Sequence, residues 1–197
     1  MVDRVFIVRH GETAWSKSGQ HTGRTDIELS PQGEANAALL GGLLHQVPFS
    51  RVFSSPRRRA AATCELAGFG ALRETDPDLA EWDYGDFEGL RTADIRKSAP
   101  GWRLFRDGCP GGESVAQVCA RADRVVARLL PLGGTVALFT HGHFSRVLAA
   151  RWVGQPAEFG EHLLIDTASV GILSHEHGDR LSPVISLWNR APSGLLA

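Results

Sequence analysis

Two arginines and two histidines follow three segments that predict buried strands, either where the strand ends or at the start of the helix that comes next. They are Arg9 and His10 after residues 4–8, Arg59 after residues 51–53, and His141 after residues 135–139. Because ligands of open α/β sheets bind beyond the carboxyl ends of the strands, we expect these four side chains to meet in one crevice. A guanidinium group presents a planar fork that binds phosphate oxygens in pairs. The pattern therefore indicates a site for a phosphate group.

Three consecutive arginines, Arg57 to Arg59, stand at the beginning of a predicted helix. Cations oppose the helix dipole there, whereas a bound anion is favoured by the dipole and by the free backbone N–H groups. The arginines are therefore easier to explain with a phosphate bound. Since successive helical residues point about 100° apart, only one or two of the three can reach the same site.

The histidines also suggest a metal site, because His141 and His143 form one HxH pair and His175 and His177 form another. Alternate residues of a strand face the same way, as two metal ligands must. No dense set of Asp, Glu or Cys accompanies either pair in the sequence, so we expect no catalytic metal. The sequence also lacks a GxxxxGK[ST] loop, which argues against a nucleoside triphosphatase.

The composition is that of one ordinary globular domain. The chain has 197 residues, with 21 Lys and Arg against 22 Asp and Glu and a net charge of −1. Such a balance gives no general attraction to nucleic acids or anionic membranes, so we expect neither as a partner. The longest stretch without charged side chains, residues 129–145, is broken by proline and glycine, and the first apolar run is too short for a signal sequence. We therefore expect a cytoplasmic protein with a single domain over residues 1–197.

Helical patterns alternate with the predicted strands. Ser30 and Pro31 begin a helix over about residues 30–46, and Ser114 begins a second amphipathic helix. We also expect helices over residues 59–66 and 144–153, a long polar loop from residue 9 to about 29, and a hairpin of strands near 171–175 and 181–187. Strands that alternate with helices favour a mostly parallel sheet covered on both faces. The expected fold is α/β, a three-layer α/β/α sandwich.

The charge balance changes between residues 74 and 94, where eight acids stand against one base, Arg91. Such a run usually forms a solvated surface, and we expect this for most of the eight. We do not expect Glu81, which lies within the segment Leu79–Gly85, to belong to this solvated surface.

Five segments resemble, in the same order, the motifs of the histidine phosphatase superfamily, in the branch similar to cofactor-dependent phosphoglycerate mutase. They are Val8–Thr13 (VRHGET), His21–Asp26 (HTGRTD), Ser54–Ala60 (SSPRRRA), Leu79–Gly85 (LAEWDYG) and Thr140–His143 (THGH). Segments around Trp15, Trp82 and Arg106 are in addition similar to the branch that contains fungal sedoheptulose-1,7-bisphosphatase and small actinobacterial acid phosphatases. The resemblance implies a phosphoglycerate mutase-like fold with a small cap segment inserted at about residues 82–113.

The resemblance implies phosphoryl transfer through a phosphohistidine. His10 matches the family's nucleophile, Arg9 and Arg59 its phosphate clamps, His141 its second phosphate-pocket histidine, and Glu81 its proton donor. Two arginines and a second histidine can stabilise the charge of the transferred group without a metal, so no cofactor is expected. Glu81 must begin protonated to donate to the leaving alkoxide, and its carboxylate must then activate water. We expect a bell-shaped rate profile on the acid side of neutrality.

Other residues of the motifs are candidates for binding the substrate. Phosphate contacts are expected from Gly11, Ser16, Thr22, Gly23 and Gly142, through backbone N–H or hydroxyl groups. The rest of the substrate is expected under the cap, where Tyr84 and Arg106, with Trp82 and Trp102, either contact it or serve in packing.

Within the family, a phosphatase is favoured over a mutase. Mutases of the family usually carry asparagine where Ser16 stands, and they have extra loops and a tail over the site, so water is expected to reach a phosphohistidine in this chain. We predict a metal-independent phosphatase of a small phosphorylated metabolite, either a sugar mono- or bisphosphate or the range of esters that a broad acid phosphatase accepts. The alternatives are mutase-type phosphoryl transfer and a catalytically silent module that binds a phosphate ligand. Relatives of this type often form homodimers, which makes a homodimer one option here.

Overall fold

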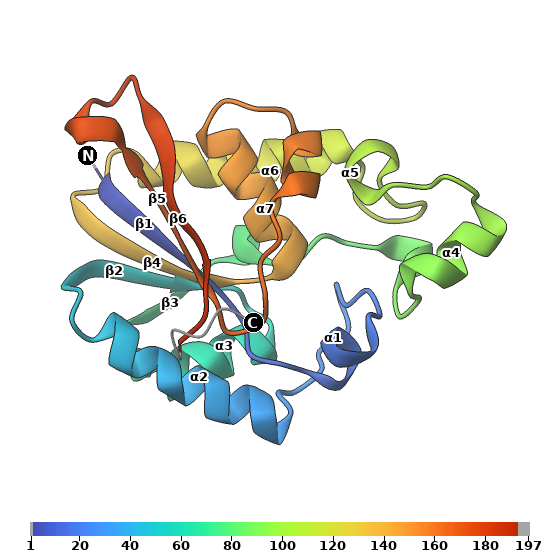
Figure 1. Ribbon diagram of the computed structural model, residues 1–197, viewed down its shortest axis with the longest axis horizontal. Coiled ribbons are helices and arrows are strands. Elements are labelled where there is room, and N and C mark those ends of the chain that lie inside the picture. The colour runs from blue at the N-terminus through green and yellow to red at the C-terminus, as the bar shows by residue number, and fades with distance from the viewer. Residues whose placement is uncertain (1, 193–197) are drawn as a thin grey trace.

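The computed structural model describes residues 2–192, and its six strands form one sheet (Figure 1). The strands are β1 (Val2–Arg9), β2 (Phe49–Ser54), β3 (Arg73–Thr75), β4 (Gly134–Thr140), β5 (Val170–His175) and β6 (Pro183–Arg190). Their order across the sheet is β3-β2-β4-β1-β5-β6. The first four of these are parallel, whereas β5 is antiparallel to β1 and β6 is antiparallel to β5. The mostly parallel sheet and the hairpin near its end are confirmed.

Long helices cover both faces of the sheet. They are α2 (Pro31–Leu44) and α3 (Arg58–Leu66) on one face, and α6 (Val115–Leu129) and α7 (Gly142–Trp152) on the other (Figure 1). Alternate residues of β1 point to opposite faces, so Val5 and Ile7 lie in one buried cluster and Phe6 and Val8 in the other. The three-layer sandwich expected from the sequence is therefore confirmed.

Shorter helices lie in the connecting segments. They are α1 (Ala14–Ser18), α4 (Thr92–Ser98), α5 (Leu104–Asp107) and single 3-10 turns at Gly70–Leu72, Pro77–Leu79, Gly85–Phe87, Ala157–His162 and Glu176–Gly178. The predicted cap, residues 82–113, contains α4 and α5, which Figure 1 shows beyond the carboxyl end of β1, as it does α1. The assignment of all 197 residues to a single domain stays a prediction.

Two predicted boundaries differ from the structure. The polar loop expected over residues 9–29 contains α1, because Thr13 and Ser16 form a reciprocal capping box that begins this short helix. The last helix of the α/β pattern begins at Gly142, with His141 as its N-cap, and not at Phe144. Glycine and histidine at these positions weaken the helical pattern, which made the predicted start two residues late.

Part of the acidic run is paired and not simply solvated. Asp76 is buried and pairs with Arg128 of α6, and Asp78 pairs with Arg124 and Arg128. These ion pairs fasten the segment that leads to Glu81 onto α6. The expectation of a solvated surface is therefore wrong for Asp76, because it did not include the arginines that α6 presents to this segment.

Candidate active site

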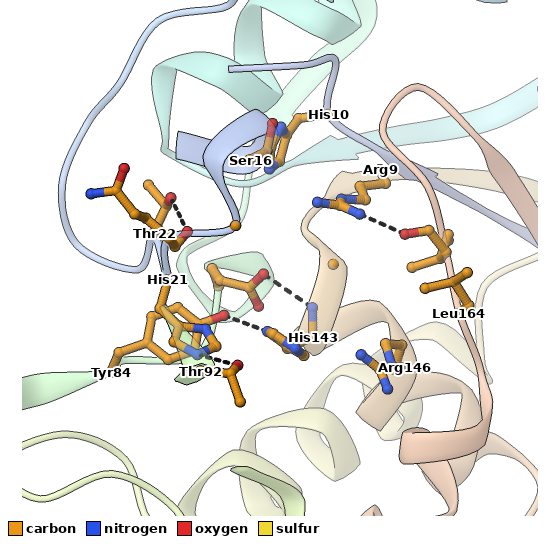
Figure 2. Close-up of a pocket in the computed structure, with 15 residues that line it drawn as sticks. Arg9, His10, Ser16, His21, Thr22, Tyr84, Thr92, His143, Arg146 and Leu164 are labelled. Atoms are coloured by element: carbon orange, nitrogen blue, oxygen red, sulfur yellow. Dashed lines mark hydrogen bonds between the residues drawn. The ribbon is translucent and has the colours of Figure 1, made fainter. Parts of the chain in front are cut away.

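A pocket of about 270 Å³ opens at the edge of the sheet where β1 and β4 end (Figure 2). Seven of the predicted site residues line it, namely Arg9, His10, Ser16, Thr22, Glu81, Tyr84 and Gly142. They come from the end of β1, from α1 and the loop after it, from the segment that precedes the cap, from the cap itself and from the start of α7. The volume suits a small molecule and not a macromolecular substrate.

His10 directs one ring nitrogen to the backbone and keeps the other free. Its Nδ1 lies 2.7 Å from the carbonyl oxygen of Gly11, and because a carbonyl can only accept, Nδ1 must carry the proton. Burial, followed by the nearby charges of Arg59 and Arg9, lowers the pKa of His10 well below its usual value. The ring is therefore neutral, and its Nε2 has a lone pair available for attack. The His141 ring lies beside it, with the two ring centroids 5.1 Å apart.

Arg9 combines a fixed guanidinium with a free donor. Its Nη1 donates to the carbonyl oxygen of Ile165 at 2.6 Å, and this hydrogen bond orients the guanidinium group in the pocket (Figure 2). Its Nε is buried and has no hydrogen-bond partner among residues 2–192. Because Arg9 lines the pocket, its guanidinium group is suited to an anion bound there.

Arg59 and His141 are fully buried directly behind the pocket. Arg59 donates from Nε to Nδ1 of His141 at 3.2 Å, and to the carbonyl oxygens of Thr22 at 2.8 Å and Thr25 at 3.0 Å. Because a guanidinium only donates, Nδ1 of His141 accepts and its Nε2 carries the proton. That Nε2 lies 2.8 Å from the hydroxyl of Ser55. Arg59 thus sets the tautomer of the second histidine.

The Glu81 carboxylate caps the start of α7. Its Oε1 accepts backbone N–H groups from Trp82 at 2.9 Å and Phe144 at 2.8 Å, and its Oε2 accepts the N–H of His143 at 3.0 Å. A helix N-terminus holds a carboxylate in this way because its first N–H groups have no partners within the helix. The contacts place Glu81 in the wall of the pocket, within the same lining as His10.

Three predicted binding residues lie outside this pocket. The Gly11 N–H donates to the Thr63 hydroxyl, the Gly23 N–H donates to the Glu88 carboxylate, and Arg106 pairs with Asp107. Arg106 is exposed because α5 turns Leu104 and Phe105 inward and leaves the following side chain to solvent. Of the cap residues that the sequence singled out, Tyr84 lines the pocket, whereas Trp82 is fully buried in the core.

The pocket also contains residues that were not predicted as binding residues, chiefly His21, Thr92, His143 and Arg146. Nδ1 of His143 lies 2.6 Å from the hydroxyl of Tyr84, and Nε2 of His21 lies 3.3 Å from that of Thr92 (Figure 2). The rings of His21 and Tyr84 stack with their centroids 4.7 Å apart. The two histidines lie within the motif segments already quoted, so membership of a motif was the available signal. Arg146 and Thr92 lie outside those motifs.

The two HxH pairs have other contacts in the structure. His143 is bonded to Tyr84, and the His175 ring packs against Trp152 with centroids 5.1 Å apart. Within residues 2–192, no group of three or more His, Cys, Asp and Glu side chains is arranged to hold a metal ion. That the reaction needs no metal stays a prediction, which the test under Proposed function addresses.

A comparison with known families agrees with this geometry, since the profile of the histidine phosphatase superfamily (branch 1) matches residues 5–190. The chain belongs to the histidine phosphatase superfamily. An acid phosphatase of Mycobacterium tuberculosis is 47% identical, with 93% of this chain and 92% of that protein covered. Sedoheptulose 1,7-bisphosphatase of Saccharomyces cerevisiae is 37% identical, with 78% of this chain and 69% of the yeast protein covered. A solved structure of an open reading frame product from M. tuberculosis has a TM-score of 0.91 at 43% identity, covering 96% of this chain and 98% of that one.

These relatives confirm the phosphoglycerate mutase-like fold and the enzyme class predicted from the sequence. The protein is a histidine phosphatase. The roles of single residues in this histidine phosphatase stay predictions, and they rest on the contacts described above.

The buried histidines of this histidine phosphatase predict that acid destabilises it. Burial lowers the pKa of His21 to about 4, and it lowers the pKa values of His10, His141 and His143 well below their usual value. The unfolded chain therefore binds more protons than the folded one below about pH 6.5, so the free energy of unfolding falls as the pH drops through that value. For His21 alone the loss at pH 5 is about 2 kcal/mol.

Urea unfolding at pH 7.5 and pH 5.0 checks this expectation. The wild type should lose several kcal/mol between the two, at about 1.4 kcal/mol per pH unit for each buried histidine. The variant His21→Gln should lose about 2 kcal/mol less than the wild type over the same interval. His162→Gln, which changes an exposed histidine, should keep the wild-type pH dependence. Equal losses in all three proteins would contradict the assignment.

Proposed function

We propose that the protein hydrolyses small phosphate monoesters through a phosphohistidine formed on Nε2 of His10. The observation that carries the proposal is the state of this ring: Nδ1 is committed to the Gly11 carbonyl, and burial keeps the ring neutral, so Nε2 is the free nucleophile. The side chains of Arg9 and Glu81 line the same pocket.

In the proposed first step, Nε2 of His10 attacks phosphorus and the bond to the ester oxygen breaks. Arg9 binds the oxygens of the phosphoryl group, and the buried pair of Arg59 and His141 adds positive potential and a fixed N–H behind them. The leaving alkoxide takes its proton from Glu81, so that an alcohol departs and the Glu81 carboxylate remains.

In the second step, the Glu81 carboxylate removes a proton from water as the oxygen attacks the phosphohistidine. The bond between phosphorus and Nε2 breaks, inorganic phosphate leaves, and His10 returns to its neutral form with Glu81 protonated. The backbone N–H of Trp82 and those of His143 and Phe144 at the start of α7 hold the carboxylate in one place through both steps. Of the other predicted residues, Ser16, Thr22 and Gly142 are positioned to contact the phosphate, because they line the same pocket.

Hydrolysis is proposed in preference to transfer between substrates. The acid phosphatase and the bisphosphatase among the relatives are both hydrolases by name, and they are 47% and 37% identical to this chain. Phosphorylated metabolites occur inside cells, so we also propose that the protein acts in the cytoplasm. No helix among residues 2–192 is long and apolar enough to cross a membrane. The homodimer and the absence of nucleic-acid partners stay predictions.

Phosphate release in the presence of EDTA tests the proposal. The panel contains an aryl phosphate, 3-phosphoglycerate, fructose-1,6-bisphosphate and sedoheptulose-1,7-bisphosphate, each measured from pH 5 to pH 8. We expect release without added metal, highest on the acid side of neutrality. Release that requires a divalent metal would contradict the mechanism, and transfer to a second metabolite without free phosphate would favour the mutase reaction.

A further inference from the structure

The reaction pocket continues into a second pocket of about 170 Å³ under the cap. The two share His21, Thr92, His143 and Arg146 in their linings, so the second pocket adjoins the first. In the view of Figure 2, His10 and Arg9 lie toward one end of the reaction pocket, while Thr92 and Arg146 lie toward the other. A substrate phosphate at His10 therefore leaves the rest of the molecule directed toward the second pocket.

Arg146 lies at the junction of the two pockets and forms no ion pair with a carboxylate among residues 2–192. It lies one helical turn after His143 on α7, and it donates to the carbonyl oxygens of Gly160 at 2.7 Å and Glu161 at 3.1 Å. Its guanidinium lies over the ring of Phe105, 4.6 Å from the centroid. These contacts fix its orientation but do not neutralise its charge. Burial lowers the pKa of Arg146, while the charges of Glu81 and Glu161 act in the opposite direction.

Arg96 adds a second cation, which is exposed to solvent. It lies on α4 and lines the second pocket, and its Nε donates to the carbonyl oxygen of Trp102 at 3.1 Å. Among residues 2–192 it forms no ion pair with a carboxylate. A third arginine of this pocket, Arg103, is neutralised by Glu161, which is the only acidic residue of the lining. The second pocket therefore has two positive charges in excess.

We propose that Arg96 and Arg146 bind a second phosphate of the substrate, so that the enzyme prefers bisphosphates to simple monoesters. The proposal rests on the proposed function, because it assumes that the first phosphate reacts at His10. Two guanidinium groups match the two negative charges of a phosphate monoester and can bond its oxygens in pairs. Between the two sites, the polar side chains of His21 and Thr92 can bond the hydroxyl groups of a sugar chain.

A series of synthetic esters tests the proposal without assuming a natural substrate. We would compare alkyl phosphates, ω-carboxyalkyl phosphates and alkanediol bisphosphates with linkers of four to seven carbons. For at least one linker we expect kcat/KM of the bisphosphate to exceed that of the alkyl phosphate about 10-fold or more. A symmetric bisphosphate carries two reactive phosphates, which alone doubles its kcat/KM relative to the alkyl phosphate. A ratio of the two kcat/KM values no greater than two at every linker length would therefore overturn the proposal. Preference for the carboxylate series would overturn the assignment to phosphate.

Arginine variants locate the effect, with matched controls on the same helices. Arg96→Met and Arg146→Met should each lower the ratio of bisphosphate to monophosphate kcat/KM about 10-fold. Lys97→Met of α4 and Arg151→Met of α7 remove one positive charge each from exposed ion pairs, and they should keep the wild-type ratio. Equal ratios in all four variants would show that the second phosphate does not bind here.

Binding to His10→Ala separates this inference from the proposed function. The variant lacks the nucleophile, so the affinities for an alkanediol bisphosphate and for the alkyl phosphate are measured without turnover. Tighter binding of the bisphosphate, lost in Arg96→Met, supports the second phosphate site even if the wild type releases no phosphate. Equal affinities for the two esters overturn the site even if the wild type is an active phosphatase.

Discussion

Replacing His10 with alanine is expected to abolish turnover, with kcat lowered about 10⁴-fold or more. The imidazole is the group that receives the phosphoryl group, and the structure leaves its Nε2 free and uncharged. A stopped assay with an aryl phosphate measures the loss, and an acid-labile phosphoenzyme should be found in the wild type alone.

Binding and control measurements complete this test. His10→Ala should still bind inorganic phosphate, because Arg9, Arg59 and His141 are unchanged. His162→Gln, at an exposed position outside the pocket, should keep wild-type activity. Turnover of His10→Ala within 10-fold of the wild type would refute a phosphohistidine at this position, and so would a phosphoenzyme in the variant.

The convergence of the phosphate-binding residues was predictable because parallel strands end at the same edge of a sheet. β1 and β4 are neighbours in parallel register, with Arg9 opposite Thr140, so the residues that follow them must lie together. The apolar strands and the glycines after them were visible in the sequence. The sequence patterns of the individual strands were therefore enough to predict that His10 lies beside His141.

The environment of the predicted residues was not visible in the same way. Arg59 was expected as a phosphate clamp and His141 as the second phosphate-pocket histidine, and the structure shows that both are buried and that the loop with Thr22 and Thr25 covers the Arg59 guanidinium. Such covering depends on contacts between segments more than 30 residues apart along the chain. A strand or helix pattern describes single segments and does not report them.

The cap also shows that sequence patterns do not predict which side chains face the substrate. Arg106 was a reasonable candidate from composition, yet the burial of Leu104 and Phe105 rotates α5 so that it faces solvent. Arg146 gave no signal, because an arginine on an amphipathic helix usually faces water. In the structure, Arg146 lines the pocket, and its guanidinium lies over the ring of Phe105, which α5 contributes.

Glu81→Gln is expected to lower kcat about 10²- to 10⁴-fold while phosphate affinity changes only a few-fold. The amide has nearly the same shape and can still accept the N–H groups of Trp82 and Phe144 through its oxygen. Its NH₂ group faces the N–H of His143 and cannot accept it, so one hydrogen bond is lost. The variant can neither donate a proton to an alkoxide nor take one from water.

The choice of substrate separates the two roles of Glu81. A nitrophenolate leaves without needing a proton, so Glu81→Gln should form the phosphohistidine rapidly from an aryl phosphate and then release phosphate slowly. This predicts a burst of nitrophenol equal to the enzyme concentration, followed by a slow steady state. An alkyl phosphate requires the proton donor, so its first step should also be slow and no burst of alcohol should appear. If neither ester gives a burst and phosphate binding weakens as in a charge-removing Arg9→Ala variant, Glu81 serves to hold the start of α7 and the phosphate site, and the proton transfers belong to another group.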